Sequence, residues 1–231
     1  MNDARVALDL ASLIHPDDAL ELIREWTADA PHPVEVLPCT REDGERALLA
    51  LQVTTRSPLG ALALHTGGLL VDHGWLRILG AGCARLPRAI DTWNFLERED
   101  LRLPRALLVA DDALGGFYAW FDEPHTIHYF APDNFVWEDL GLGYTDWLVT
   151  MLSPNLEGFY ADLRWPGWVD EVSSLAGSDA LQTYPPLVFE HDGPRSRAAV
   201  PVESAWVLGL KLARALEELP PDGKLRFEVV D

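Results

Sequence analysis

Residues 107–152 constrain the fold of this chain more than any other stretch. They contain three short runs of apolar, aromatic and β-branched residues, at 107–110, 117–121 and 126–130. Gly115 and Gly116 lie between the first two runs and Pro124 lies between the second and third, which is typical of strands joined by tight turns. A helical pattern follows at 144–152. The stretch therefore predicts an antiparallel meander that leads into a helix.

The rest of the chain adds helices and further strands. Amphipathic spacing predicts helices at 19–27, 42–53 and 205–219, and flanking prolines favour an edge strand at 34–37. Short strands are expected at 61–65, after a turn at 57–60, and at 69–71, 75–79 and 225–229, whereas 165–186 is expected to be mostly irregular. We predict a single α+β domain over residues 1–231, with a mainly antiparallel sheet and flanking helices. A subdivision near residue 155 is the alternative.

The balance of charged residues limits the partners. Thirty-seven acidic and eighteen basic residues give a formal net charge of −19 at pH 7, and such a surface repels nucleic-acid phosphates and anionic lipids. Nucleic acid and membranes are therefore not expected as partners, and a basic protein is favoured, although acidity also serves solubility alone.

The start of the chain lacks the basic and apolar regions of a signal peptide, which predicts a cytoplasmic protein.

One short window contains residues with catalytic or metal-binding chemistry. His65, Asp72, His73 and Cys83 are metal-ligand types, but their spacing matches no zinc motif, and a tight loop explains them equally well. An enzyme hypothesis, a small-molecule hydrolase or ligand-binding enzyme, would place its pocket among these four residues and Arg88. No glycine group has a phosphate-binding spacing. We therefore expect no cofactor and no metal, and the sequence assigns no catalytic residue.

Two further sets of residues, the histidines at 125 and 128 and the two cysteines, could in principle bind a metal or form a disulfide. His125 and His128 lie at a strand entrance, where side chains three apart point to opposite faces, so they should not share a metal. The two cysteines, Cys39 and Cys83, are far apart in the sequence, and a disulfide between them is not expected.

Aromatic residues favour a binding role. Alternation within 117–121 places Tyr118 and Trp120 on one face, which is either covered or exposed as a contact surface. Trp75, beside an Asp-His-Gly turn, is a second candidate, because protein interfaces are enriched in tryptophan and arginine. The candidate binding residues are Asp72, His73, Trp75, Arg88, Tyr118 and Trp120. The leading hypothesis is a non-enzymatic protein-binding module; a third alternative is a homodimer with an apolar patch around Tyr118 and Trp120.

Several segments resemble a bacterial family catalogued as domain of unknown function 2625. They are TTRSPLGALALHTGGLLVDHGWLRILGAG at 54–82, Leu86-Pro87-Arg88 with Trp93-Asn94, LGGFYAW at 114–120 and RAAVPVESAW at 197–206. The resemblance runs from about Asp17 to the end of the chain, and it implies no activity.

Residues 107–152 are also similar in pattern, more distantly, to the SUKH superfamily. Many members of that superfamily look like immunity proteins against contact-dependent toxins, so this resemblance implies a toxin as the basic partner. The chain departs from the pattern, because the strands expected at 62–79 interrupt the helix-rich N-terminal part, and about eighty residues follow the helix without a counterpart.

Overall fold

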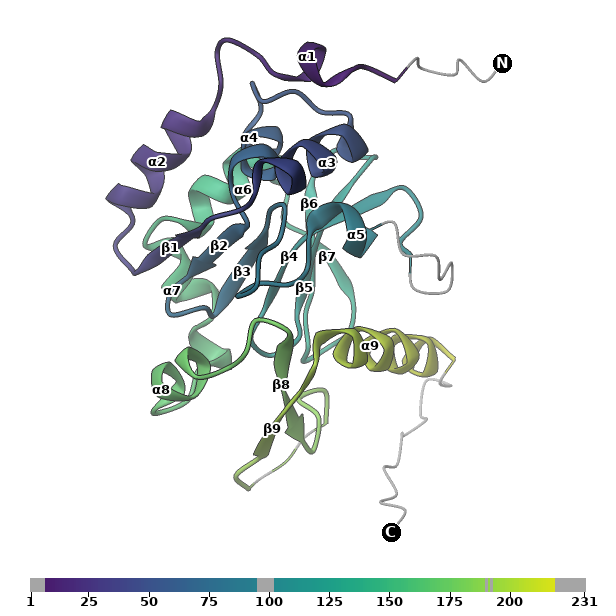
Figure 1. Ribbon diagram of the computed structural model, residues 1–231. Coiled ribbons are helices and arrows are strands. Elements are labelled where there is room, and N and C mark those ends of the chain that lie inside the picture. The colour runs from purple at the N-terminus through teal and green to yellow at the C-terminus, as the bar shows by residue number, and fades with distance from the viewer. Residues whose placement is uncertain (1–6, 95–101, 190, 192, 219–231) are drawn as a thin grey trace.

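A seven-stranded antiparallel sheet forms the centre of the molecule (Figure 1). The computed structural model describes residues 7–94, 102–189, 191 and 193–218. The strands pair in chain order, each with the next. They are β1 Val34–Leu37, β2 Gly68–Val71, β3 Leu76–Leu79, β4 Ala106–Asp112, β5 Phe117–Phe121, β6 Ile127–Phe130 and β7 Trp137–Asp139. The predicted α+β class and the predicted meander are confirmed, and β1 is an edge strand, as expected.

Helices and a second sheet surround this one. The helices are α1 Leu10–Leu13, α2 Leu20–Asp29, α3 Arg41–Leu51, α4 Pro58–His65, α5 Ile90–Asn94, α6 Tyr144–Met151, α7 Asn155–Phe159, α8 Trp168–Ser173 and α9 Val202–Glu217, with a 3₁₀ turn at Ala161–Leu163. The strands β8 Asp179–Tyr184 and β9 Ser196–Pro201 form an antiparallel hairpin. None of the helices in the described part of the chain is long and apolar enough to cross a bilayer.

Both faces of the central sheet are covered. On one face Phe117 packs against Trp206 of α9, with ring centroids 4.8 Å apart. On the other face Tyr118 packs against Trp147 of α6 at 5.2 Å. Because neighbouring residues of a strand point to opposite sides, this single strand anchors two layers. The alternation in β5 allowed its aromatic face to be either covered or exposed. At Phe117 and Tyr118 the structure shows that it is covered.

The strand predicted at 61–65 is wrong, and so is the turn predicted at 57–60. Residues 58–65 form helix α4, whose N-cap is Ser57. The Ser57 Oγ accepts a hydrogen bond from the Gly60 N–H at 3.1 Å, and Pro58 occupies the first turn, where its missing N–H costs nothing. The Ala-Leu alternation at 61–64 is compatible with either a strand or a helix, and the capping residues favour the helix.

The irregular structure expected at 165–186 is also wrong in part, because α8 and β8 lie there. Strand β8 is tied to the end of β4 by a hydrogen bond from the Leu181 N–H to the Ala113 carbonyl, at 2.7 Å. The strand predicted at 225–229 lies outside the described residues.

A buried ion network joins the hairpin region to the sheet. Asp111 of β4 lies between Arg77 and Arg88, at 2.7 Å and 2.5 Å, and Asp111 and Arg77 are 1% and 2% exposed. Arg77 also donates to the Asp179 carbonyl, and Arg88 to the Gly177 carbonyl. The two arginines thus connect the central sheet to the start of β8, across the position near 155.

Candidate functional site

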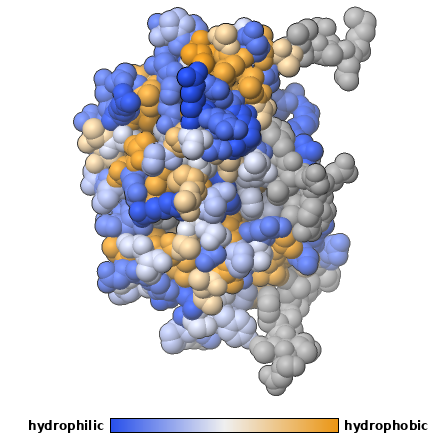
Figure 2. All heavy atoms as spheres, in the orientation of Figure 1, coloured by the Kyte–Doolittle hydropathy of each residue, from blue (hydrophilic) through white to orange (hydrophobic). Residues whose placement is uncertain are grey.

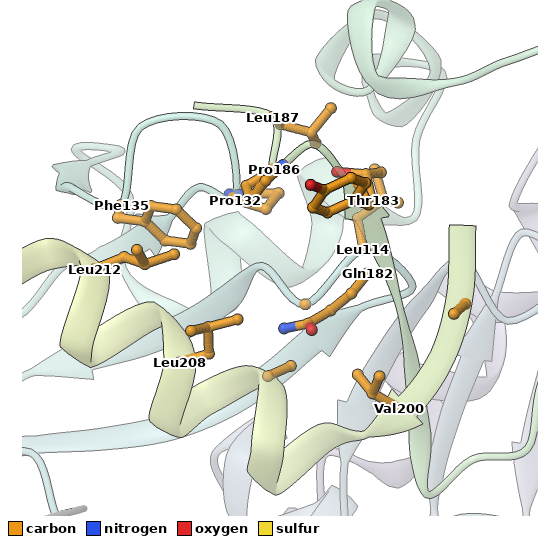
Figure 3. Close-up of a pocket in the computed structure, with 14 residues that line it drawn as sticks. Leu114, Pro132, Phe135, Gln182, Thr183, Pro186, Leu187, Val200, Leu208 and Leu212 are labelled. Carbon is orange, nitrogen blue, oxygen red and sulfur yellow. The ribbon is translucent and has the colours of Figure 1, made fainter. Parts of the chain in front are cut away.

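An apolar pocket lies between α9, the β8–β9 hairpin and the β4–β5 turn (Figure 3). Its volume is about 280 Å³. Leu208 and Leu212 of α9 form one side, and Pro186 and Leu187 of the loop after β8 form another. In Figure 2, hydrophobic residues lie at several levels of this face, and one of these is the level that α9 has in Figure 1.

Helix α9 builds its side of the pocket from a four-residue spacing. Leu208 and Leu212 share a face because residues four apart are neighbours on a helix. Gly209, between them, lets the helix approach the sheet: a Cβ there would lie 3.0 Å from a ring carbon of Phe130. The sequence predicted this helix, but the pattern did not show that part of its apolar side faces a pocket.

The β4–β5 turn forms the floor, and Asp112 holds it in place. The Asp112 carboxylate accepts hydrogen bonds from the N–H groups of Leu114 and Gly116, both at 2.9 Å, and from the Tyr129 hydroxyl at 2.6 Å. Asp112 is fully buried, and burial raises the pKa of its carboxyl above the usual range. Gly115, with φ +78°, packs beneath α9, where its Cβ would lie 3.2 Å from that of Ala205.

The loop between β8 and β9 forms the rim, and Arg195 organises it. The Arg195 guanidinium donates to the carbonyls of Pro185 and Pro186 at 2.8 Å and to the Phe189 carbonyl at 2.6 Å. These three bonds fix the backbone that presents Pro186 and Leu187 to the pocket. Sequence analysis missed the loop and the hairpin, and with them the pocket.

The chemistry of the pocket wall is that of a binding site. None of the fourteen residues that line it is charged at neutral pH, and the polar side chains are those of Gln182, Thr183 and Tyr184. These fourteen described residues offer no carboxylate, imidazole or thiol for proton transfer or nucleophilic attack. The pocket can enclose an apolar group, and the Gln182 carboxamide can exchange hydrogen bonds with a polar atom attached to that group.

The residues of the enzyme hypothesis have separate partners. The His65 Nε2 lies 2.9 Å from Asp18, the Asp72 carboxylate lies 2.6 Å from Arg164, and the His73 ring packs on Trp168 at 6.1 Å. Within the part of the chain that the structure covers, no group of three or more His, Cys, Asp or Glu residues could hold a metal ion.

Trp75 lies inside the molecule and not on the turn surface. It is fully buried, and the Arg164 guanidinium lies 5.0 Å from its ring centroid and 4.2 Å from that of Trp168. The same arginine pairs with Asp72, whose φ of +50° places it in the left-handed region, as does the +62° of His73. Trp75 and Asp72 therefore stabilise this turn through Arg164, as a packed cation–π and ion-pair cluster.

The remaining candidates are also engaged in internal contacts. Arg88 belongs to the buried network around Asp111. Tyr118 is fully buried, its hydroxyl lies 2.6 Å from that of Tyr160, and burial raises its pKa well above the usual value. Trp120 is partly exposed and stacks on His125 at 5.7 Å, and its indole N–H donates to the His125 carbonyl. The apolar patch expected around Tyr118 and Trp120 therefore does not include Tyr118, which Trp147 of α6 and Phe159 of α7 cover, whereas Trp120 remains partly exposed.

The two cysteines are free thiols. Cys39 and His65 line the same open groove, a proximity that the sequence did not indicate. The Cys39 thiol donates to the Leu64 carbonyl at 3.6 Å, and burial, followed by the nearby Asp43 and Cys83, raises its pKa. The thiol therefore stays protonated at neutral pH, which makes it a poor nucleophile.

These features define the class of protein: an α+β chain with a sequential antiparallel meander and an apolar pocket at its C-terminal side. The chain belongs to the family described as protein of unknown function DUF2625, whose model matches residues 10–205.

Two relatives extend this assignment. The uncharacterized protein YbfG of Escherichia coli strain K12 is 38% identical over 195 residues, which cover 82% of this chain and 89% of that protein. An uncharacterized protein of Haemophilus influenzae strain Rd is 36% identical over 172 residues, which cover 71% of this chain and 75% of that protein. No solved structure matches the chain. The relatives therefore supply a family and no activity.

Proposed function

We propose that this chain is a non-enzymatic protein-binding module whose site is the pocket between α9, the β8–β9 hairpin and the β4–β5 turn. The observation that carries this proposal is the apolar wall of the pocket, in which no lining residue of the described part of the chain is charged at neutral pH. Such pockets in interfaces take one anchoring side chain of a partner, and a few anchors supply most of the affinity.

The partner is a basic protein. The net charge of −19 attracts cationic surfaces and accelerates their encounter with this chain, in a salt-dependent manner. The pattern shared with the SUKH superfamily favours a toxin as that partner and an immunity-like role in the cytoplasm. A second copy of this chain is the competing occupant, and the oligomeric state of the purified protein separates the two.

The alternative, a hydrolase or ligand-binding enzyme with its site among His65, Asp72, His73 and Cys83, has less support. A nucleophile needs a general base within hydrogen-bond reach. Here Asp72 is paired with Arg164. His65, which lies beside Asp18, shares its groove with Cys39, and burial raises the pKa of the Cys39 thiol.

The test compares two neighbouring substitutions in β9. Ala198 lines the pocket, whereas Ala199 points to the opposite face of the hairpin, and both are exposed. Ala198→Phe fills the pocket, and Ala199→Phe is the matched control. Proteins captured from the source bacterium by the wild type are purified and titrated against all three forms at low and high salt.

A basic partner that binds the wild type and Ala199→Phe, but binds Ala198→Phe about tenfold or more weakly, supports the proposal. Its affinity should also fall as salt rises. Equal binding to Ala198→Phe and to the wild type contradicts it.

A further inference from the structure

The Gln182 carboxamide is a free polar group in an apolar wall. It makes no hydrogen bond to any residue that the structure describes, although it lines the pocket. In Figure 3 it extends from β8 toward α9. A carboxamide offers two donors and an acceptor, and covering it without a partner is unfavourable because its hydrogen bonds to water are lost. An occupant that fills the pocket must therefore form a hydrogen bond with the Gln182 carboxamide, or it will bind more weakly.

The uncharged wall of the pocket excludes a lysine or arginine side chain as the anchor. None of the described residues that line the pocket is charged at neutral pH, so a lysine or arginine side chain buried among them would lack a counter-ion. The basic residues of the partner therefore lie outside the pocket, over the acidic surface of the chain, and the anchor itself is neutral.

Size and polarity together point to one class of side chain. A volume of about 280 Å³ is at the small end of ligand pockets and suits a single large side chain. Tyrosine and tryptophan combine an apolar ring with one hydrogen-bonding group at the tip, whereas phenylalanine and leucine have no such group.

We infer that the anchor of the partner is a tyrosine or tryptophan whose O–H or N–H group pairs with the Gln182 carboxamide. The inference rests on the proposed function, because it specifies the residue that the partner inserts. It assigns to Gln182 the role of the specificity-determining residue of the pocket.

The experiment uses single amino acids with blocked ends as probes of the anchor. N-acetyl amides of tyrosine, tryptophan, phenylalanine and lysine are titrated into the isotope-labelled full chain, and the amide resonances of Gln182, Ala198 and Gly115 are followed by NMR. The Gln182→Leu variant is titrated in parallel, with Ala199→Phe as the control that leaves the pocket intact.

We expect the tyrosine and tryptophan amides to bind about 2- to 10-fold more tightly than the phenylalanine amide, as one net hydrogen bond predicts. The lysine amide should give no saturable shift. Gln182→Leu should remove this preference and bind the phenylalanine amide at least as well as the wild type does.

Equal affinities for the tyrosine and phenylalanine amides overturn the inference, as does a preference that survives Gln182→Leu. Absence of saturable shifts with every probe overturns it as well. These failures are distinct from failure of the proposed function, because the Ala198→Phe comparison uses the whole partner and leaves Gln182 in place.

Discussion

At the scale of single residues, Asp111 and Asp112 show how two adjacent acids acquire different roles. Paired acids beside a strand are typical of solvated turns. Here Asp111 faces two arginines, and Asp112 faces the N–H groups of its own turn. Strand alternation predicts that they face opposite sides. It does not predict burial, because Arg77 and Arg88 come from other parts of the chain.

The buried Asp112 gives a pH-dependent prediction. Burial raises its folded-state pKa, so the folded protein binds a proton more tightly than the unfolded chain, and stability falls as pH rises above about 4 toward the raised pKa. The carboxamide introduced by Asp112→Asn would retain an oxygen for the two N–H groups and would not ionise. We therefore expect the stability of Asp112→Asn, relative to the wild type, to increase with pH over this window.

Urea unfolding of both proteins at several pH values measures this difference. A difference between Asp112→Asn and the wild type that is independent of pH would contradict the prediction. Asp146→Asn, on an exposed position of α6, is the control and should leave the pH profile unchanged.

At the scale of elements, short-range signals predicted most of the central sheet but not all of its surroundings. The runs at 117–121 and 34–37 became β5 and β1 with the expected bounds, because aromatic, β-branched and proline residues leave few alternatives there. Residues 61–64 alternate Ala and Leu, which fits either a helix or a strand, and the Ser57 cap favours the helix over residues 58–65. The β8–β9 hairpin has few β-branched residues and a long connecting loop, so its pairing was not visible in the sequence.

The cap of α4 gives the second prediction. Ser57→Ala removes the bond to the Gly60 N–H and the bond that the Ser57 hydroxyl donates to the Thr54 carbonyl at 2.9 Å. We expect a loss of about 1–2 kcal/mol in the free energy of unfolding. Chemical denaturation measures it. Ser174→Ala, an exposed serine at the end of α8, is the control, and a loss no larger than that of the control would show that the cap does not stabilise α4.

At the scale of the whole molecule, the ion network around Asp111 couples the parts of the chain before and after residue 155. Arg77 and Arg88 lie before residue 100, yet both donate to carbonyls after residue 175. The sequence identified Arg88 as a candidate binding residue because arginine is common in interfaces. Its position inside this network depends on long-range contacts, which no local pattern reveals.

This coupling predicts that residues 1–231 unfold as one domain. In urea, the far-ultraviolet circular dichroism, which reports the helices and strands on both sides of residue 155, and the fluorescence of the tryptophans should give coincident transitions. Asp111→Ala leaves two buried guanidinium groups unpaired and should lower the stability by about 3–5 kcal/mol. Two separate transitions in the wild type would indicate a division near 155 instead.

The sequential order of β1 to β7 has a consequence for synthesis on the ribosome. Each strand pairs with the next along the chain, so the hairpins of the sheet can assemble as they emerge, without waiting for distant segments. The pocket differs, because α9 supplies one wall and is translated last among the described elements. All seven strands of the central sheet are therefore synthesised before the helix that covers Phe117, and a chain on a ribosome stalled before residue 202 would lack both this covering layer and one wall of the pocket.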